Sequence, residues 1–161
     1  MAKIERKFMA HFINVTPNAE AAYERLGKDL EEYSVDMSAD VKKTKNIIGQ
    51  TSVNISSYDR SGSVEPFYAD KDSRLFPWLQ SIIDEGKALD DVRTDAVEVH
   101  LWEEASPANT YPAYKETVYV EVTSYGGDTT GYQIPFTCHY AGDRIKGKFD
   151  ISTGKFTPDE A

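Results

Sequence analysis

Apolar and polar positions alternate most regularly between residues 114 and 149. Within residues 114–125, three alternate positions are valine: Val118, Val120 and Val122. Residues 132–140 continue with another apolar series: Tyr132, Ile134, Phe136, Cys138 and Tyr140. A period of two places neighbouring residues on opposite faces of a strand, so one face is apolar and the other polar. Gly126 and Gly142 tolerate the positive φ angles of hairpin turns, which predicts an antiparallel meander that turns at these glycines.

Shorter stretches of the chain predict further strands. The expected strands are residues 8–15, 30–37, 52–58, 63–69, 94–103 and a last short one within 151–158. The alternation in 30–37 is imperfect, and Pro66 interrupts 63–69. Residues 19–26 predict a short helical turn, which Gly27 would end.

One helix is predicted over residues 72–86. Its apolar positions follow helical spacing: Leu75, Leu79 and Ile82 or Ile83. Pro77 fits a helix only in its first turn, so the helix proper is expected to begin near Phe76, unless the first turn is separate. Gly86 can terminate it.

The order of these elements predicts the fold class. Seven or more strands accompany a single helix, and no strand–helix–strand rhythm is present. One helix cannot cover both faces of a sheet, so we expect a mainly β protein, a β-sandwich or split barrel of antiparallel strands, with one flanking helix. Linkers, repeats and low-complexity segments are absent from the sequence, which predicts a single domain over residues 1–161.

Residues 38–51 connect two of the predicted strands with far more chain than a hairpin needs, since two to five residues suffice. They bring a cluster of cations and exposed apolar residues into an acidic protein: Val41, Lys42, Lys43, Lys45, Ile47 and Ile48. One interpretation is a flexible surface loop. The other is a docking arm whose lysines meet an acidic neighbour while its isoleucines fill an apolar notch.

Composition narrows the class of protein. The 161 residues carry a formal net charge of −9, which argues against tight binding to nucleic acid because phosphate binding needs a basic surface. The single cysteine, Cys138, forbids an intrachain disulfide and is expected to be a buried, unreactive thiol. Neither a secretory signal nor a membrane-spanning stretch is visible, so we expect a protein made in the cytoplasm that does not insert into membranes.

Candidate chemistry is sparse. His11, His100 and His139 belong to different predicted strands and share no metal-ligand spacing. The glycine-rich stretch 126–131 joins two strands, whereas phosphate-binding loops precede a helix. No catalytic, metal or cofactor site is therefore predicted, and we do not expect an enzyme. A basic stripe remains that suits either phosphate or an acidic subunit interface: Arg144, Lys146 and Lys148.

Unpaired sheet edges are the main feature left by this pattern. Long alternating strands with a polar outer face invite edge pairing with another chain, and Pro66 and Pro135 are the only obvious internal blockers. The alternative is a monomeric β-sandwich binding module in which helix and loops cover every edge. Such a module could bind carbohydrate through Trp78, Trp102 and surface tyrosines.

Several segments, taken in order, resemble the tail tube (major tail) proteins of bacteriophages and prophages of Gram-positive bacteria. The segments are Lys28–Tyr33, Lys45–Thr51, Ser63–Ala69, Ser124–Phe136 and His139–Gly147. The resemblance covers nearly the whole chain. No single segment is diagnostic, and the order of the segments carries the resemblance.

The resemblance implies a tail tube fold and a structural role in the virion. Family members form hexameric rings that stack into a hollow tube, in which strands of all subunits join into one inner β-barrel. The tube conducts DNA in transit, and its partners are tape-measure, tail-tip and tail-terminator proteins. The long connection at about 38–51 would then contact the next ring through Val41, Lys42, Lys43, Lys45, Ile47 and Ile48.

The resemblance also suggests which residues line the tube. If strands near 30–37, 52–58, 116–124 and 131–140 form the inner sheet, the candidate lumen-facing residues are Glu32, Ser34, Asp36, Asn54, Ser56, Glu121, Thr123, Gln133 and Thr137. Pro135 lacks the N–H that a central strand needs, so a bulge or a subunit seam is expected there. The inner tube of a contractile tail, or of a phage-tail-like bacteriocin, is an alternative function.

Overall fold

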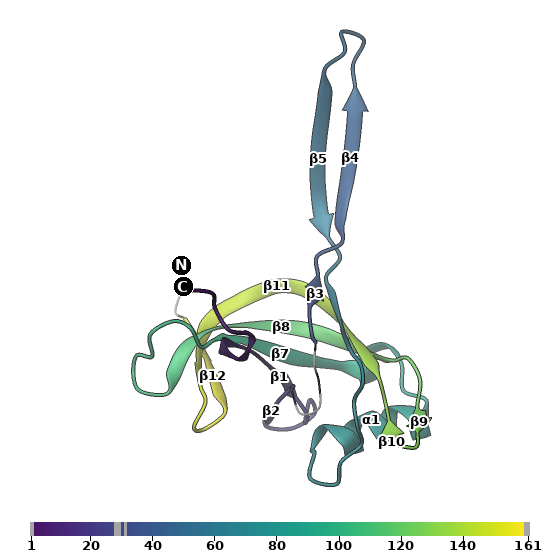
Figure 1. The fold of residues 1–161 in the computed structure, drawn as a ribbon, viewed down its shortest axis with the longest axis vertical. Helices are drawn as coiled ribbons and strands as arrows, with labels where there is room; N and C mark the ends of the chain where they lie inside the picture. Colours follow the sequence, from purple (N-terminus) through teal and green to yellow (C-terminus); the bar gives the residue numbers. More distant parts are fainter. Residues whose placement is uncertain (1, 28–29, 31, 160–161) are drawn as a thin grey trace.

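A computed structural model describes residues 2–27, 30 and 32–159. It consists of a curled β-sheet body, a long hairpin that projects from it, and one α-helix on the far side of the body from the tip of the hairpin (Figure 1). The elements are β1 (Met9–Asn14), β2 (Tyr23–Arg25), β3 (Val35–Asp36), β4 (Ala39–Lys45), β5 (Thr51–Tyr58), β6 (Ser61–Val64), α1 (Leu75–Glu85), β7 (Arg93–His100), β8 (Thr110–Val122), β9 (Gly126–Asp128), β10 (Gly131–Gln133), β11 (Phe136–Asp150) and β12 (Lys155–Pro158). Two short 3-10 helices cover Arg6–Phe8 and Leu89–Val92.

The body is one antiparallel sheet. Its strands lie in the order β2-β1-β7-β8-β11-β6-β3, and β12 pairs with β11 beside this path. The centre is the long β8–β11 pair, which keeps one register from Phe136 opposite Val122 to Ala141 opposite Thr117. The predicted fold class, mainly β with antiparallel strands and one flanking helix, is confirmed.

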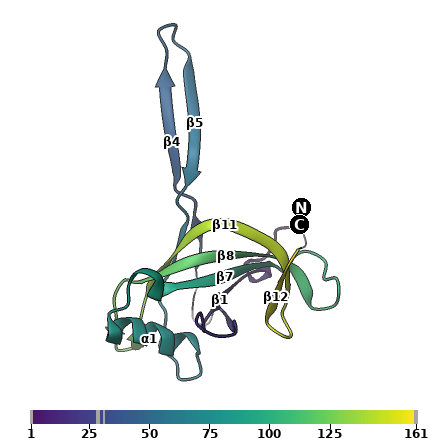
Figure 2. The ribbon, with the colours of Figure 1, turned by 180° about the vertical axis from the view of Figure 1, so that it is seen from behind.

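The larger apolar core lies on one face of this sheet, beneath α1 (Figure 2). Side chains alternate between the two faces along β8 and β11, so Val118, Val120, Phe136 and Cys138 all lie on that face. They pack there with apolar residues of the helix. The buried helix residues are Leu75, Trp78, Leu79 and Ile82. The helix begins at Leu75 with a proline in its first turn and ends at Gly86, whose φ of 61° is the left-handed cap that the sequence predicts. The buried thiol of Cys138 is also as predicted, and burial raises its pKa to about 12.

A smaller core lies on the opposite face, at the other end of the same strands. Val97, Val99, Ala113 and Phe149 are fully buried there, and aromatic rings from β1, β2 and β12 close over them. Phe12 and Tyr23 lie 4.6 and 5.7 Å from the Phe149 ring, measured between centroids. The two apolar cores therefore lie on opposite faces of the sheet and at opposite ends of it. Each face keeps one half that neither apolar core covers.

Three sequence predictions in the body are wrong. Of the expected strand 63–69, only residues 63 and 64 belong to a strand, β6. Residues 23–25 form strand β2 and not a helical turn, because the backbone pairs with β1 at the edge of the sheet. Gly142 does not reverse the chain. It has φ of 73° at an irregularity between Ala141 and Ile145, and β11 continues through it for fifteen residues. A β-bulge uses a positive φ as readily as a turn does, so the glycine alone does not distinguish them.

The region between 30 and 58 also differs from the prediction. Only Val35–Asp36 of the expected strand 30–37 is a strand, and Glu31 within it lies outside the described residues. Within the long connection 38–51, residues 39–45 are strand β4, so that only five residues, 46–50, remain as a turn. Pro135 lies between β10 and β11, outside both strands, where its carbonyl accepts the Thr123 N–H at 3.1 Å.

None of the helices in the described part of the chain is both long and apolar enough to cross a membrane. Across residues 2–27, 30 and 32–159, no three His, Cys, Asp or Glu side chains come together as a metal site.

Candidate assembly surface

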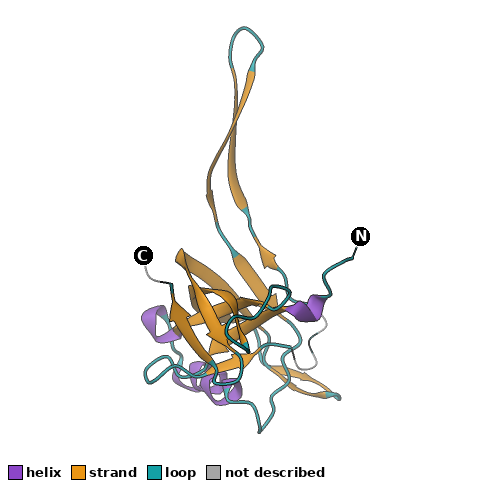
Figure 3. Cartoon of the chain, turned by 90° about the vertical axis from the view of Figure 1, so that its left-hand side faces the viewer, coloured by secondary structure: helices purple, strands orange, loops and turns teal. Residues whose placement is uncertain are grey.

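The hairpin β4–β5, residues 39–58, is called the arm below. Its two strands pair with each other over seven partners, and among the described residues they pair with no other strand. The arm rises from the edge pair β3–β6 and points away from the body (Figure 3). Its two outer edges therefore present backbone N–H and C=O groups that are free to add another strand.

Every residue of both arm strands is exposed, although the arm has one apolar face. Directly opposed residues share a face, and the register places Val41 opposite Ile55 and Lys43 opposite Val53. A strip of three branched aliphatic side chains and two lysine stems thus runs up one side. Lys42 opposite Asn54 lies on the other side. Exposed apolar strips of this kind mark surfaces that bind a partner.

The tip of the arm, Asn46–Gln50, is a hydrogen-bonded turn. The Asn46 side-chain oxygen accepts the N–H groups of Ile48 at 3.1 Å and Gln50 at 3.0 Å, and the Gln50 carbonyl accepts the Asn46 N–H at 3.0 Å. Gly49 supplies the positive φ of 84° that closes the turn. The turn holds Ile47 and Ile48 in water, with exposed fractions of 103% and 73%. An ordered turn that exposes two isoleucines is a candidate contact for a partner.

The foot of the arm joins the body beside a charged cluster. The Asp59 N–H donates to the Ser38 carbonyl at 3.1 Å, which continues the ladder from the arm toward the sheet. The Arg60 guanidinium pairs with the buried Glu116 carboxylate. Arg144 Nε donates to the second Glu116 oxygen at 2.8 Å, and the same guanidinium also pairs with Glu98. Arg144 therefore has an intramolecular role in this structure: it links two carboxylates of the body.

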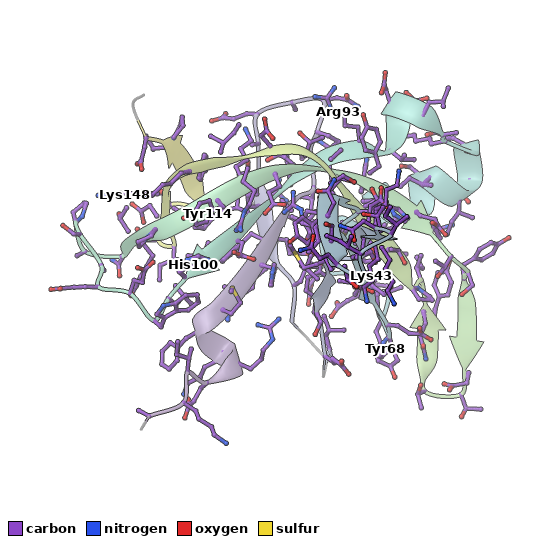
Figure 4. All side chains as sticks on the ribbon, turned by 90° about the horizontal axis from the view of Figure 1, so that it is seen from above. Lys43, Tyr68, Arg93, His100, Tyr114 and Lys148 are labelled. Atoms are coloured by element: carbon purple, nitrogen blue, oxygen red, sulfur yellow. The ribbon has the colours of Figure 1, made fainter. Side chains whose placement is uncertain are left out.

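Glu98 lies at the centre of this cluster. His100 Nε2 is 2.8 Å from one Glu98 oxygen, and His11 Nε2 is 3.6 Å from the other. The Arg144 guanidinium also stacks on the Tyr114 ring, 4.2 Å from its centroid, and Tyr114 lies next to His100 (Figure 4). Burial raises the pKa of Glu98, but the histidine contacts and the Arg144 charge outweigh it and hold this pKa well below its usual range.

A polar half-face lies on the opposite side of the sheet from α1. Cross-strand pairs place Ser63, Thr137 and Glu121 in one row, and Ser61, His139 and Tyr119 in the next. His139 Nε2 is 2.8 Å from a Glu121 oxygen. This polar face thus contains two candidate lumen residues, Glu121 and Thr137, and the Asp36–Ser61 pair adds a third, Asp36.

The other candidate lumen residues lie elsewhere. Asn54 and Ser56 belong to the arm, where Ser56 Oγ donates to Asp40 at 3.1 Å. Gln133 lies in the small β9–β10 hairpin, and Thr123 follows the end of β8. Glu32 and Ser34 are exposed residues of the segment that leads into β3.

The register also places the two lysines of the basic stripe. Lys146 pairs with Tyr114 and Lys148 with Pro112, so both lie on the sheet face opposite to Glu121 and Thr137. Lys148 Nζ donates to the Ser106 carbonyl at 3.2 Å. Arg93 and Lys115 lie on the same face as Glu121 and Thr137, each opposed to a residue of that face.

Sequence reasoning missed part of the arm surface. Val53 and Ile55 alternate as a buried strand would, but they are 59% and 49% exposed because no element covers them. Met37 and Tyr58 at the foot are also about half exposed. The run of polar and basic residues in 39–45 was a signal for this exposure. A strand that pairs with such a segment and with no other strand has no apolar neighbour to cover its side chains.

Comparison with known proteins gives structural similarity only. The sequence matches no protein-family model, and no curated protein matches it. A chain in the cryo-EM structure of an extracellular contractile injection system, the PVC sheath/tube terminator in the extended state, superposes with a TM-score of 0.53 at 12% identity. The superposition covers 91% of this chain and 97% of that one. The extended PVC sheath-tube complex gives the same TM-score and identity, covering 89% and 90%. At this identity the likeness establishes the shared fold.

Proposed function

We propose that this chain is a structural, non-enzymatic subunit of a phage tail tube, which self-assembles into stacked hexameric rings that conduct DNA into the host. The observation that carries the proposal is the arm. A two-stranded hairpin alone in water is marginally stable, yet this one extends from the body with an apolar strip and an apolar tip exposed. Such a hairpin gains its stability from contacts with a second molecule.

Ring closure is supported by the edges of the body sheet. The sheet ends at β2, three residues long, and at β3, two residues long, and these two strands do not pair with each other. An open curled sheet can close with copies of itself, since a cyclic arrangement joins each edge to the next subunit and removes exposed edges. In this proposal six copies complete one barrel, and the arms connect successive rings.

The polar face is the proposed lining of the tube. Its candidate lumen residues Asp36, Glu121 and Thr137 are acidic or neutral, and His139 is already paired with Glu121. Arg93 and Lys115 lie on the same face but are opposed to different parts of it, Tyr119 and Val97. A surface without a basic cluster allows a polyanion to pass without strong binding. Lys146 and Lys148 lie on the other face, which is consistent with this assignment.

The inner tube of a contractile tail or phage-tail-like bacteriocin is a second candidate. It is favoured by the comparisons, because both similar structures come from an extracellular contractile injection system. The two candidates share the subunit architecture and differ in the surrounding sheath. Expected partners in either case are tape-measure, tail-tip and tail-terminator proteins.

Sedimentation velocity and negative-stain electron microscopy over a range of protein concentrations test the proposal. Rings with a central hole, or tubes, are expected at high concentration or when tail-tip and tape-measure proteins nucleate them. A chain that stays monomeric at high concentration with those proteins present would refute the proposal and favour a monomeric binding module.

A further inference from the structure

A small cavity lies between β2 and the segment that leads into α1. Its volume is about 260 Å³, and its apolar walls include Leu26, Val64 and Phe67. Engineered apolar cavities of about 150 Å³ hold a benzene molecule, so this one has room for a branched aliphatic side chain. The walls are firm, because Val64 is buried and the Phe67 ring packs edge-on against Phe136 at 5.6 Å between centroids.

The rim of this cavity is acidic. Among the described residues that line it, Glu24, Asp70 and Asp72 are acidic and Arg25 is basic. Glu24 is held in place by the Ser73 hydroxyl at 2.8 Å and the Arg74 N–H at 2.9 Å, so its charge is fixed beside the opening. The Asp72 side chain is exposed. The cavity thus combines an apolar floor with a negative rim.

The arm carries the complementary chemistry. Its three lysines against one aspartate, Asp40, give it a net charge of +2 on a chain whose net charge is −9. Lys43 and Lys45 lie just behind the two tip isoleucines. The apolar tip of the arm, with lysines behind it, is therefore complementary to a cavity that has an apolar floor and an acidic rim.

The two features lie at opposite ends of the molecule. The tip is at one extreme, while β2 and the start of α1 are at the other (Figures 1 and 2). Viewed along the arm, Lys43 and Tyr68, a cavity-lining residue, lie close together in projection (Figure 4). A copy displaced along the arm axis therefore brings its cavity toward the tip. The seven residues of β4 span about 23 Å, which gives the arm the reach to leave its own body.

We propose that this cavity is the receptor for the arm tip of a second copy, with Ile47 or Ile48 on its apolar floor and the arm lysines against Glu24, Asp70 and Asp72. The contact is heterologous, since tip and cavity are different surfaces, and repeated head-to-tail contact stacks copies without limit. The inference rests on the proposed tube function and adds the site that receives the arm.

Cysteine crosslinking tests the pairing directly. Cys138 is buried with a raised pKa, so the native chain offers no competing reactive thiol. Ile47→Cys combined with Leu26→Cys, treated with a short bismaleimide in the assembled state, should give a ladder of dimers, trimers and longer species on a denaturing gel. The matched control is Ile47→Cys combined with Glu104→Cys, an exposed loop position away from the cavity, and it should stay a single band.

The outcomes separate this inference from the proposed function. Rings or tubes in the microscope together with no Leu26 crosslink, or with equal crosslinking of the Glu104 control, would overturn the receptor assignment and leave the tube intact. Failure of the native chain to assemble under any condition would overturn both. Each double variant is first checked for a native urea transition, and Tyr68→Cys replaces Leu26→Cys if the latter fails to fold.

A charge exchange gives an independent readout. Two variants are made separately: the single variant Asp72→Lys, and a triple variant with Lys42→Glu, Lys43→Glu and Lys45→Glu. Each should raise the protein concentration at half-maximal stacking about tenfold. Mixing the two variants should recover much of that loss, because the acidic arm then meets a rim without net negative charge, while the native arm of the other variant meets a native rim. A mixture no better than its components would contradict the assignment.

Discussion

The body and the arm are built from the same kind of strand and are stabilised differently. In β8 alternate side chains are buried across the sheet, whereas in β4 and β5 every residue is exposed. The body therefore gains stability from apolar burial, while the arm depends on its backbone ladder and the Asn46 turn. The difference separates the part that folds around its own core from the part whose apolar strip stays in water.

The largest expected effect comes from one truncation made in both regions. Ile13 in β1 is fully buried and Ile55 in the arm is 49% exposed. Ile13→Ala should lower the free energy of unfolding by about 2–5 kcal/mol, since it leaves a cavity in the core. Ile55→Ala should change it by no more than about 0.5 kcal/mol. Urea titration of both variants measures the contrast, and equal losses would show that the arm packs on its own body.

The charged cluster provides the next effect. Because the folded-state pKa of Glu98 lies below its ordinary 4.5, its contribution is complete above that pH and is lost as the pH falls through and below it. Glu98→Gln should cost about 1–3 kcal/mol at pH 7 and should flatten the acid loss of stability. Glu121→Gln, in an exposed pair, is the control and should cost less than about 1 kcal/mol. Urea titrations at pH 7, 5 and 3 compare the two variants. If Glu98→Gln lost as much unfolding free energy between pH 7 and pH 3 as the native chain does, the role of the cluster would be contradicted.

A smaller, local effect is expected at the tip of the arm. Asn46→Ala removes the oxygen that accepts two backbone N–H groups, so the arm should lose about 1 kcal/mol of local stability. Hydrogen exchange of β4 and β5 amides should quicken, with no change in β8 or β11. Asn54→Ala, the same truncation away from the turn, should leave arm exchange unaltered. Faster exchange throughout the body would mean that arm and body unfold together.

The smallest effect on folding is expected from the arm lysines. Lys42, Lys43 and Lys45 are exposed, and replacing all three with glutamate should leave the unfolding free energy within about 0.5 kcal/mol of the native value. Stacking should nevertheless weaken about tenfold and give shorter tubes, because the arm would then carry the same charge as an acidic neighbour. Tube length in electron micrographs checks this. Tubes of normal length would exclude a docking role for the lysines.

The comparison also explains how much of the fold could be predicted. Where one face of an element is buried, its sequence shows the matching period: β7, β8 and α1 lie close to their predicted positions because Val118, Val120, Leu75 and Leu79 must reach the core. Strand β4 has both faces in water, so its sequence shows no regular alternation of apolar and polar residues. Its polar run was interpreted as a loop for that reason.

The missed contacts are those that depend on distant residues. Strand β2 forms because β1 offers an edge to residues 23–25, which local propensity does not reveal. In the Glu98–Arg144–Glu116 cluster, Arg144 lies 46 residues from Glu98 and 28 residues from Glu116 along the chain, and the irregularity between Ala141 and Ile145 sets its position along β8. The docking chemistry of residues 41–48 could be proposed from composition alone, but the cavity beside Leu26 required the fold.

A cryo-EM reconstruction of the protein in its assembled state tests the central claim most directly. The account predicts cyclic rings in which the sheet edges at β2 and β3 are paired with neighbouring copies, and arms that cross from each ring to the next. A monomer whose arm lies on its own body, with both sheet edges covered within the same chain, would contradict it.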